Sequence, residues 1–279
     1  MNAKTKVELE QALSLSDKQI NLAEAALMVA QLEYPQLDIK NYLLQIQQMA
    51  DEISHRLPAS PSAGDTLNQL NQVLFVEKGF SGNRDNYYDP RNSFLNDVID
   101  RKMGIPISLS ILYLQLGESL GLPLAGVSFP GHFLVKLDLD DGAIILDPYY
   151  GGISLSEDDL YERLQDFYGD KFKREDTFSL LESSSKQDIV TRIMRNLRNL
   201  YMHDGDWEKA LLMADMMVDF DTDKADVIKS RAAIYDKLEC GLAALNDYKS
   251  YLKMKPNAAD TMKIRERIIR LSESSKYLN

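Results

Sequence analysis

An apolar stretch in the middle of the chain, residues 104–152, gives the clearest hydrophobic pattern in the sequence. Between Ile105 and Val135 the only formally charged side chain is Glu118. Prolines, glycines and serines interrupt the stretch, so no unbroken apolar segment approaches the roughly 18–20 residues that a membrane-spanning helix needs. We therefore interpret the stretch as the centre of a globular core, built from one buried helix and a hairpin that follows it.

The first half of the stretch predicts a helix that starts at Pro106 and stops at Gly121. Its leucines and isoleucines alternate in places, and this alternation alone would also fit a strand. The length of the run, a proline suited to a first helical turn and a glycine suited to a helix end favour the helix. Because the segment is apolar on most sides, we expect the helix to be buried on most sides.

The second half predicts a β-hairpin whose turn lies in residues 138–142. Strand alternation directs Phe133 and Val135 to one face and His132 to the other. If the strands pair symmetrically about the turn, Asp147 lies opposite His132 or within about one residue of it. Cross-strand neighbours share a face, so these two side chains are predicted to meet beside the start of the buried helix.

The first part of the chain also has the periodicity of helices. A capping pattern at Ser16 predicts a helix that Pro35 ends, Asp38 caps a second helix, and a third helix reaches Leu74. We expect the three to pack on a common core. A loop rich in Tyr, Asn and Asp follows over residues 79–93. It predicts either a surface loop with side-chain turns or one wall of a functional site.

The last third of the sequence repeats itself. Ala210 matches Ala244 at a spacing of 34 residues, three further pairs match at the same spacing, and 34 is the tetratricopeptide period. We predict two repeats, residues 188–221 and 222–255, closed by a helix over residues 258–272. An unrelated helical bundle is the alternative.

A polar, serine-rich segment, residues 178–187, precedes the repeats and is interpreted as a linker. We therefore predict two domains, residues 1–183 and 184–279. Two repeats bury little surface by themselves, so we expect the second domain to depend on the first for stability.

Charge and cysteine content narrow the possible functions. The chain has 32 basic and 43 acidic residues, a net charge of −11, and no basic stripe, so we do not expect nucleic acid as a partner. The one cysteine, Cys240, excludes an intramolecular disulfide and a CxxC motif. The three histidines have no ligand-like spacing, so no metal or other cofactor is expected. Residues 1–10 lack the apolar segment of a signal peptide, and we expect a cytoplasmic protein without membrane attachment.

Four motifs carry a resemblance to a known family. They are Asp89-Pro90-Arg91-Asn92-Ser93, Gly104-Ile105-Pro106-Ile107-Ser108-Leu109, Pro130-Gly131-His132-Phe133 and Asp147-Pro148-Tyr149-Tyr150-Gly151-Gly152. Together they resemble the bacterial SirB-type proteins over nearly the whole chain. The resemblance implies an α+β fold: a papain/transglutaminase-like domain, in which a helix packs on an antiparallel sheet, with N-terminal helices before it. An all-α tetratricopeptide-repeat domain follows.

The resemblance also implies positions for a Cys-His-Asp triad. His132 and Asp147 fit the His and Asp positions of the superfamily. Aligning Gly121 with the superfamily's Gly-Ile-Pro turn places the nucleophile in the first turn of the core helix, where this sequence has no cysteine. The nearest hydroxyls belong to Ser108 and Ser110. A serine gains less activation from a helix N-terminus than a thiol does, and it needs both a base and an oxyanion hole.

Each candidate catalytic residue has a structural alternative. Ser108 is either a nucleophile or a first-turn serine that bonds to its own backbone. His132 is either a catalytic base or a buried, hydrogen-bonded core histidine. Asp147 either orients the imidazole or caps the turn that follows it. The further residues expected to line the site are Asn92, Asn96, Gly131 and Tyr149.

The missing cysteine favours a degenerate transglutaminase-like domain. We therefore predict a protein-binding or regulatory module whose repeats contact a protein partner. The alternative is a hydrolase or acyltransferase that uses Ser108, His132 and Asp147. Such an enzyme requires an open cleft in which the Ser108 hydroxyl lies within hydrogen-bond reach of His132.

Overall fold

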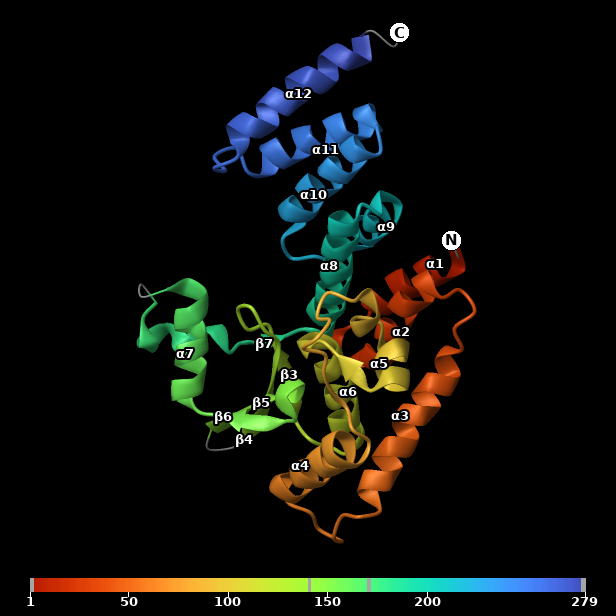
Figure 1. Cartoon of the computed structure of the whole chain (residues 1–279), viewed down its shortest axis with the longest axis vertical. Helices are drawn as coiled ribbons and strands as arrows, with labels where there is room; N and C mark the ends of the chain where they lie inside the picture. Colours follow the sequence, from red (N-terminus) through yellow and green to blue (C-terminus); the bar gives the residue numbers. More distant parts are fainter. Residues whose placement is uncertain (1–2, 140–141, 170–171, 277–279) are drawn as a thin grey trace. The chain divides into compact units, whose positions relative to one another are not determined.

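The computed structural model describes residues 3–139, 142–169 and 172–276, and the chain divides into two units, Met1–Ile193 and Met194–Asn279. The first unit combines helices with a five-stranded sheet, and the described residues of the second unit form helices (Figure 1). The predicted order, N-terminal helices, then a helix-on-sheet domain, then a helical domain, is therefore confirmed.

The helices of the first unit are α1 (Ala3–Leu13), α2 (Leu22–Glu33), α3 (Ile39–Ser54), α4 (Ala63–Asn71), α5 (Leu95–Arg101), α6 (Pro106–Ser119) and α7 (Glu157–Tyr168). Its strands are β1 (Ser81–Gly82), β2 (Met103–Gly104), β3 (Leu124–Val127), β4 (Leu134–Leu139), β5 (Gly142–Asp147), β6 (Ile153–Leu155) and β7 (Ser183–Ser184). Helix α8 (Lys186–Asp204) begins in the first unit, and α9 (Trp207–Met217), α10 (Lys224–Lys237), α11 (Gly241–Met254) and α12 (Thr261–Lys276) follow it.

Helix α2 begins later than the sequence pattern predicts. The Ser16 hydroxyl bonds to the side chain of Gln19 at 2.5 Å and caps no backbone group, so residues 17–19 form only a short 3-10 turn. The cap of α2 is Asn21, whose side chain accepts the backbone N–H of Glu24 at 2.9 Å. The predicted cap of α3 is present: Asp38 accepts a backbone N–H from the first turn of that helix.

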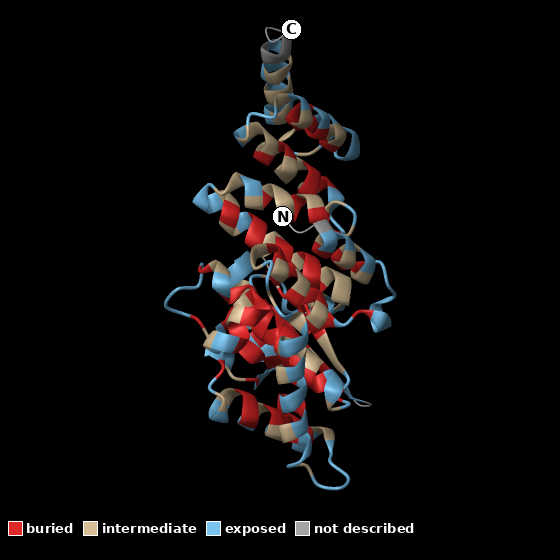
Figure 2. Cartoon of the chain, turned by 90° about the vertical axis from the view of Figure 1, so that its right-hand side faces the viewer, coloured by how far each residue is buried: buried red, intermediate tan, exposed pale blue. Residues whose placement is uncertain are grey.

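The sheet has the strand order β6-β5-β4-β3-β7, and every neighbouring pair is antiparallel. Strands β4 and β5 form the predicted hairpin, with Leu139 opposite Gly142 at its closed end. Residues 140–141, part of the predicted turn, lie outside the described residues. The buried positions of this unit gather in its interior, around the sheet and its covering helices (Figure 2).

Different helices cover the two faces of the sheet. Leu134 of β4 packs in one cluster with Leu160 of α7. On the other face, Gly117 of α6 lies so close to Leu124 of β3 that an added Cβ would come within 2.3 Å of the leucine Cδ1. Leu124 is paired with Leu137, and Leu137 and Leu134 point to opposite faces because they are an odd number of residues apart. Helix α7 therefore covers one face and α6 the other.

The segment predicted to be a linker, residues 178–187, is partly structured. Its Ser183–Ser184 forms the edge strand β7, and the Ser184 hydroxyl bonds to that of Ser128 at 2.9 Å. The predicted boundary after residue 183 therefore falls inside β7, whereas the chain divides into its two compact units at residues 193–194, within α8. The division into independent folding domains stays a prediction.

The second unit repeats its turns as well as its helices. Gly205 and Glu239, which are 34 residues apart, both have positive φ, 79° and 59°. The next residue in each repeat, Asp206 or Cys240, is the N-cap of the following helix. Helices α9, α10 and α11 each have a buried and an exposed side, and α12 packs its partly buried Ile264, Ile268 and Leu271 against their core (Figure 2), as expected when stacked repeats bury a shared core.

Candidate functional site

Asp147, the last residue of β5, is at the centre of the site and has no exposed surface. Its Oδ1 lies 3.0 Å from Nε2 of His132 and accepts the backbone N–H of Tyr149 at 3.1 Å. Its Oδ2 accepts Nη1 of Arg163, from α7, at 2.7 Å. The structure thus contains the predicted His132–Asp147 contact, and Asp147 both bonds the imidazole and caps the turn after β5.

The hairpin register differs slightly from the predicted one. Val135 pairs with Leu146, so continuing the ladder places Leu134 opposite Asp147. His132 precedes Leu134 by two residues and lies in the bend before β4. Symmetric closure about residues 138–142 would place Phe133 opposite Asp147, so the observed register is shifted by one residue from the assumed one, because Asp138 and Leu139 are still paired in the ladder. The imidazole still reaches the carboxylate because both side chains lie on the face covered by α7.

Two effects of opposite sign act on the pKa of Asp147. Burial penalises the charged carboxylate, but the hydrogen bonds and charges of His132 and Arg163 outweigh the penalty, so the pKa lies below its ordinary value. Asp147 is therefore a carboxylate at neutral pH. A carboxylate can only accept hydrogen bonds, so it holds the proton of His132 on Nε2 and leaves Nδ1 for another partner.

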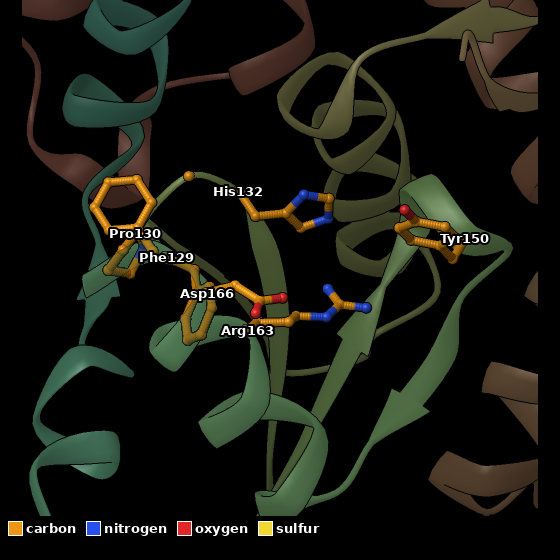
Figure 3. Close-up of a pocket in the computed structure, with 8 residues that line it drawn as sticks. Phe129, Pro130, His132, Tyr150, Arg163 and Asp166 are labelled. Carbon is orange, nitrogen blue, oxygen red and sulfur yellow. The ribbon is translucent and has the colours of Figure 1, made fainter. Parts of the chain in front are cut away.

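An open pocket of about 330 Å³ lies beside this contact. The residues that line it are Phe129, Pro130, Gly131, His132, Tyr150, Arg163, Asp166 and Phe167. The side chains of His132, Arg163 and Tyr150 converge at one end of the pocket (Figure 3). Gly131 has a φ of +68°, and an added Cβ would lie 2.9 Å from the Phe167 ring. Glycine is therefore required there both by the backbone and by the close approach of α7.

Two consecutive tyrosines join the pocket to the Tyr-rich loop. The Tyr149 ring is buried, lies 5.8 Å from the His132 ring and donates its hydroxyl to the Asn83 carbonyl at 3.2 Å. Tyr150 is 41% exposed, and its ring centroid lies 4.7 Å from the guanidinium carbon of Arg84 and 5.5 Å from that of Arg163. Part of the predicted loop therefore lies beside the site.

Ser108 lies in the first turn of α6 and is 1% exposed. Its hydroxyl lies 2.5 Å from the Asn92 carbonyl, to which it donates, and accepts the Ile105 N–H at 3.1 Å. Among the described residues, no hydrogen bond joins Ser108 to His132. Helix α6 covers the sheet face opposite to the one that carries Asp147. The structure thus brings His132 and Asp147 together and gives Ser108 different partners.

Of the predicted lining residues, Gly131 borders the pocket and Tyr149 contacts His132. Asn92 is fully buried, and its Nδ2 donates to the Asn86 carbonyl at 2.7 Å, which fixes the Tyr-rich loop. Asn96 lies on α5, and its buried Oδ1 has no hydrogen-bond partner among the described residues. Neither asparagine is among the residues that line the pocket.

The sequence did not reveal the contributions of Arg163, Asp166 and Arg84. Arg163 lies 16 residues after Asp147 in the chain, and their contact depends on how α7 packs on the sheet. Tyr150 follows Tyr149 in the motif of residues 147–152, and this adjacency was the one sequence signal for its place in the pocket.

Along the described residues, no helix combines the length and the apolar composition needed to cross a membrane. The same residues contain no group of three or more His, Cys, Asp or Glu side chains arranged to hold a metal ion.

Comparison with known proteins agrees with this architecture. A sequence model of the transglutaminase-like superfamily matches residues 40–195, and a tetratricopeptide-repeat model matches residues 197–268. A UPF0162 protein of Xylella fastidiosa is 34% identical over 260 residues, which cover 93% of this chain and 92% of that protein. A UPF0162 protein of Vibrio cholerae is 29% identical over 268 residues, covering 95% and 98%. The UPF0162 protein YchA of Escherichia coli is 26% identical over 270 residues, covering 91% and 95%.

The fold and these matches define a protein with a transglutaminase-like domain followed by a tetratricopeptide-repeat region. The architecture implied by the sequence motifs is thereby confirmed. More specifically, the chain belongs to the UPF0162 family.

Proposed function

We propose that the chain is a protein-binding or regulatory module built on a degenerate transglutaminase-like domain, with the repeats as its partner-binding part. The state of Ser108 is the main support. Its hydroxyl is buried and bonds to backbone groups of Asn92 and Ile105, whereas a nucleophile needs a base within hydrogen-bond reach. The only cysteine, Cys240, is exposed and belongs to the repeat unit.

The repeat region supports the binding role. Tetratricopeptide repeats stack into extended surfaces that bind other proteins. The likeness of the motifs to SirB-type proteins, which combine the same two parts, agrees with a regulatory role for the whole chain. In this proposal His132 and Asp147 act as structural residues that hold the bend before β4 to the turn after β5.

One observation favours a second candidate, a hydrolase or acyltransferase that uses Ser108, His132 and Asp147. The contact of 3.0 Å between His132 and Asp147, beside an open pocket, resembles the orienting half of a catalytic triad. Catalysis would require the Ser108 hydroxyl to leave the Asn92 carbonyl and approach His132.

A labelling experiment separates the two candidates. The purified full chain is treated with a fluorophosphonate probe, with Ser108→Ala and Ser110→Ala as matched variants and His132→Ala as the test of the base. We expect no labelling that depends on Ser108. Labelling that disappears in Ser108→Ala and His132→Ala but persists in Ser110→Ala would establish the enzyme.

Affinity capture tests the binding role of the repeats. Met262 and Ile269 are 69% and 56% exposed on α12, so Met262→Gln/Ile269→Gln removes apolar surface without touching the helix's packed side. The control, Leu44→Gln/Val76→Gln, changes two side chains of the first unit that are 56% and 69% exposed. We expect a partner that the wild type and the control retain and the α12 variant loses. Equal recovery on all three chains would count against binding through this part of the repeats.

A further inference from the structure

Two arginines lie in or next to the pocket beside His132, in a chain whose net charge is −11: Arg163 lines the pocket, and Arg84 stacks on the lining residue Tyr150. Arg163 donates to Asp147 through Nη1, and its Nε and Nη2 have no hydrogen-bond partner among the described residues. Arg84 stacks on Tyr150 and, within the described part of the chain, forms no ion pair. A guanidinium carries five N–H donors in a planar fork that matches a carboxylate. Donors for an anionic ligand are therefore available.

The pocket also contains an acceptor. Asp166 lines it and, among the residues that the structure describes, has no ion-pair partner. Nδ1 of His132 is available because Asp147 holds Nε2. An inorganic anion without a proton to donate would satisfy the arginines but would leave the Asp166 carboxylate without a partner. A ligand that carries a carboxylate next to an N–H group satisfies both sets of groups, because the carboxylate faces Arg163 and the N–H faces an acceptor.

The walls of the pocket suit a peptide rather than a small polar molecule. Phe129, Pro130 and Phe167 form an apolar side, and Phe167 is 56% exposed. Tyr150 supplies an exposed aromatic ring that contacts two arginines. Aromatic residues and arginine are the residue types that dominate binding energy at protein interfaces.

We propose that this pocket binds a carboxylate borne by a peptide, with Arg163 and Arg84 as the cationic anchors and Tyr150 as the ring against which the ligand packs. The site lies in the first unit and goes beyond the proposed function, which concerns the repeats. The carboxylate belongs either to the C-terminus of the peptide or to an acidic side chain. Both sources share the same chemistry, and an experiment can separate them.

The test uses NMR spectroscopy of the isotope-labelled full chain with three small probes. N-acetylglycine represents a peptide C-terminus, N-acetylglutamate α-amide represents an acidic side chain, and N-acetylglycinamide is the uncharged control. We expect saturable shifts of the His132 and Tyr150 ring signals with a carboxylate at millimolar concentration, the affinity range of such small ligands. The carboxylate probe that binds more tightly shows whether the pocket prefers a peptide C-terminus or an acidic side chain. An equal response to the amide, or no saturable shift with either carboxylate, would overturn the proposal.

Variants test the two anchors. Arg84 is exposed and makes no hydrogen bond within the described residues, so Arg84→Gln should fold normally and weaken carboxylate binding by about three- to tenfold. Arg265→Gln removes the same charge from an exposed arginine on α12 and should bind as the wild type does. Arg163→Lys keeps the charge but loses the planar fork, and it should also weaken binding. Wild-type affinity in both anchor variants would refute the assignment. Because the probes report on the first unit, this result is independent of partner capture by the repeats.

Discussion

Replacing Ser108 by alanine should destabilise the first unit, whereas the same replacement at Ser110 should not. Both serines lie on α6 and are almost completely buried, at 1% and 0% exposure. They differ in hydrogen bonding. The Ser108 hydroxyl bonds to Asn92 and Ile105, whereas that of Ser110 has no partner among the described residues. The pair therefore isolates the contribution of one buried hydroxyl's hydrogen bonds.

The structure sets the expected magnitudes. Removing the Ser108 hydroxyl leaves the buried Asn92 carbonyl without its donor at 2.5 Å, and an unsatisfied buried group costs about 1–3 kcal/mol. Two effects reduce this loss: the Ile105 N–H keeps a long contact of 3.4 Å with the same carbonyl, and alanine favours a helix over serine by about 0.5 kcal/mol. We expect a net loss of about 1–2 kcal/mol. Ser110→Ala removes an unsatisfied hydroxyl and should stabilise by about 0.5–1.5 kcal/mol.

Thermal unfolding of the full chain, followed by circular dichroism, measures both changes. A change of 1 kcal/mol shifts Tm by about 2–4 °C in a unit of this size. Trp207, the only tryptophan, lies in the second unit, and its fluorescence gives an internal reference. Equal shifts for the two variants would refute the assignment of Ser108 to a structural hydrogen bond. An unchanged Tm for Ser108→Ala, together with loss of Ser108-dependent probe labelling, would instead support the enzyme.

Three further predictions follow from the described contacts. Asp147→Asn should destabilise the first unit by about 3 kcal/mol, because it removes the charge from a buried carboxylate paired with a histidine and an arginine. Folding lowers the pKa of Asp147, so the stability that this carboxylate contributes is complete above its ordinary pKa of 3.8 and is lost as the pH falls through the lowered pKa of the folded state. Denaturant unfolding at several pH values should show this loss of stability in acid for the wild type and not for Asp147→Asn. Cys240→Asp should raise the Tm of the second unit by adding the side-chain cap that Asp206 supplies in the preceding repeat, worth about 0.5–1 kcal/mol, and an unchanged Tm would contradict this. A fragment of residues 188–279 should melt below the full chain because two repeats bury little surface, and a cooperative transition at the full-chain temperature would show that it folds independently.

The sequence by itself determined the local elements and their order. The buried helix from Pro106, the hairpin and the helices of the repeats follow from patterns within one or two turns, and the repeats add a spacing of 34 residues. The contact between His132 and Asp147 could also be predicted from the sequence, because a hairpin brings together residues that are only 15 positions apart. The register of the hairpin was harder to predict, because the turn length depends on geometry that the hydrophobic pattern does not encode.

Only the tertiary structure decided which candidates meet. Ser108 lies on α6, which covers one face of the sheet, whereas Asp147 points to the other face, toward Arg163 of α7. Each helix was predictable from its own segment, but the face that it covers is fixed by packing between distant segments. For that reason the motifs suggested a triad, whereas the packing built an Asp147–His132–Arg163 site on one face of the sheet and left Ser108 on the helix of the other face, bonded to the backbone of Asn92 and Ile105.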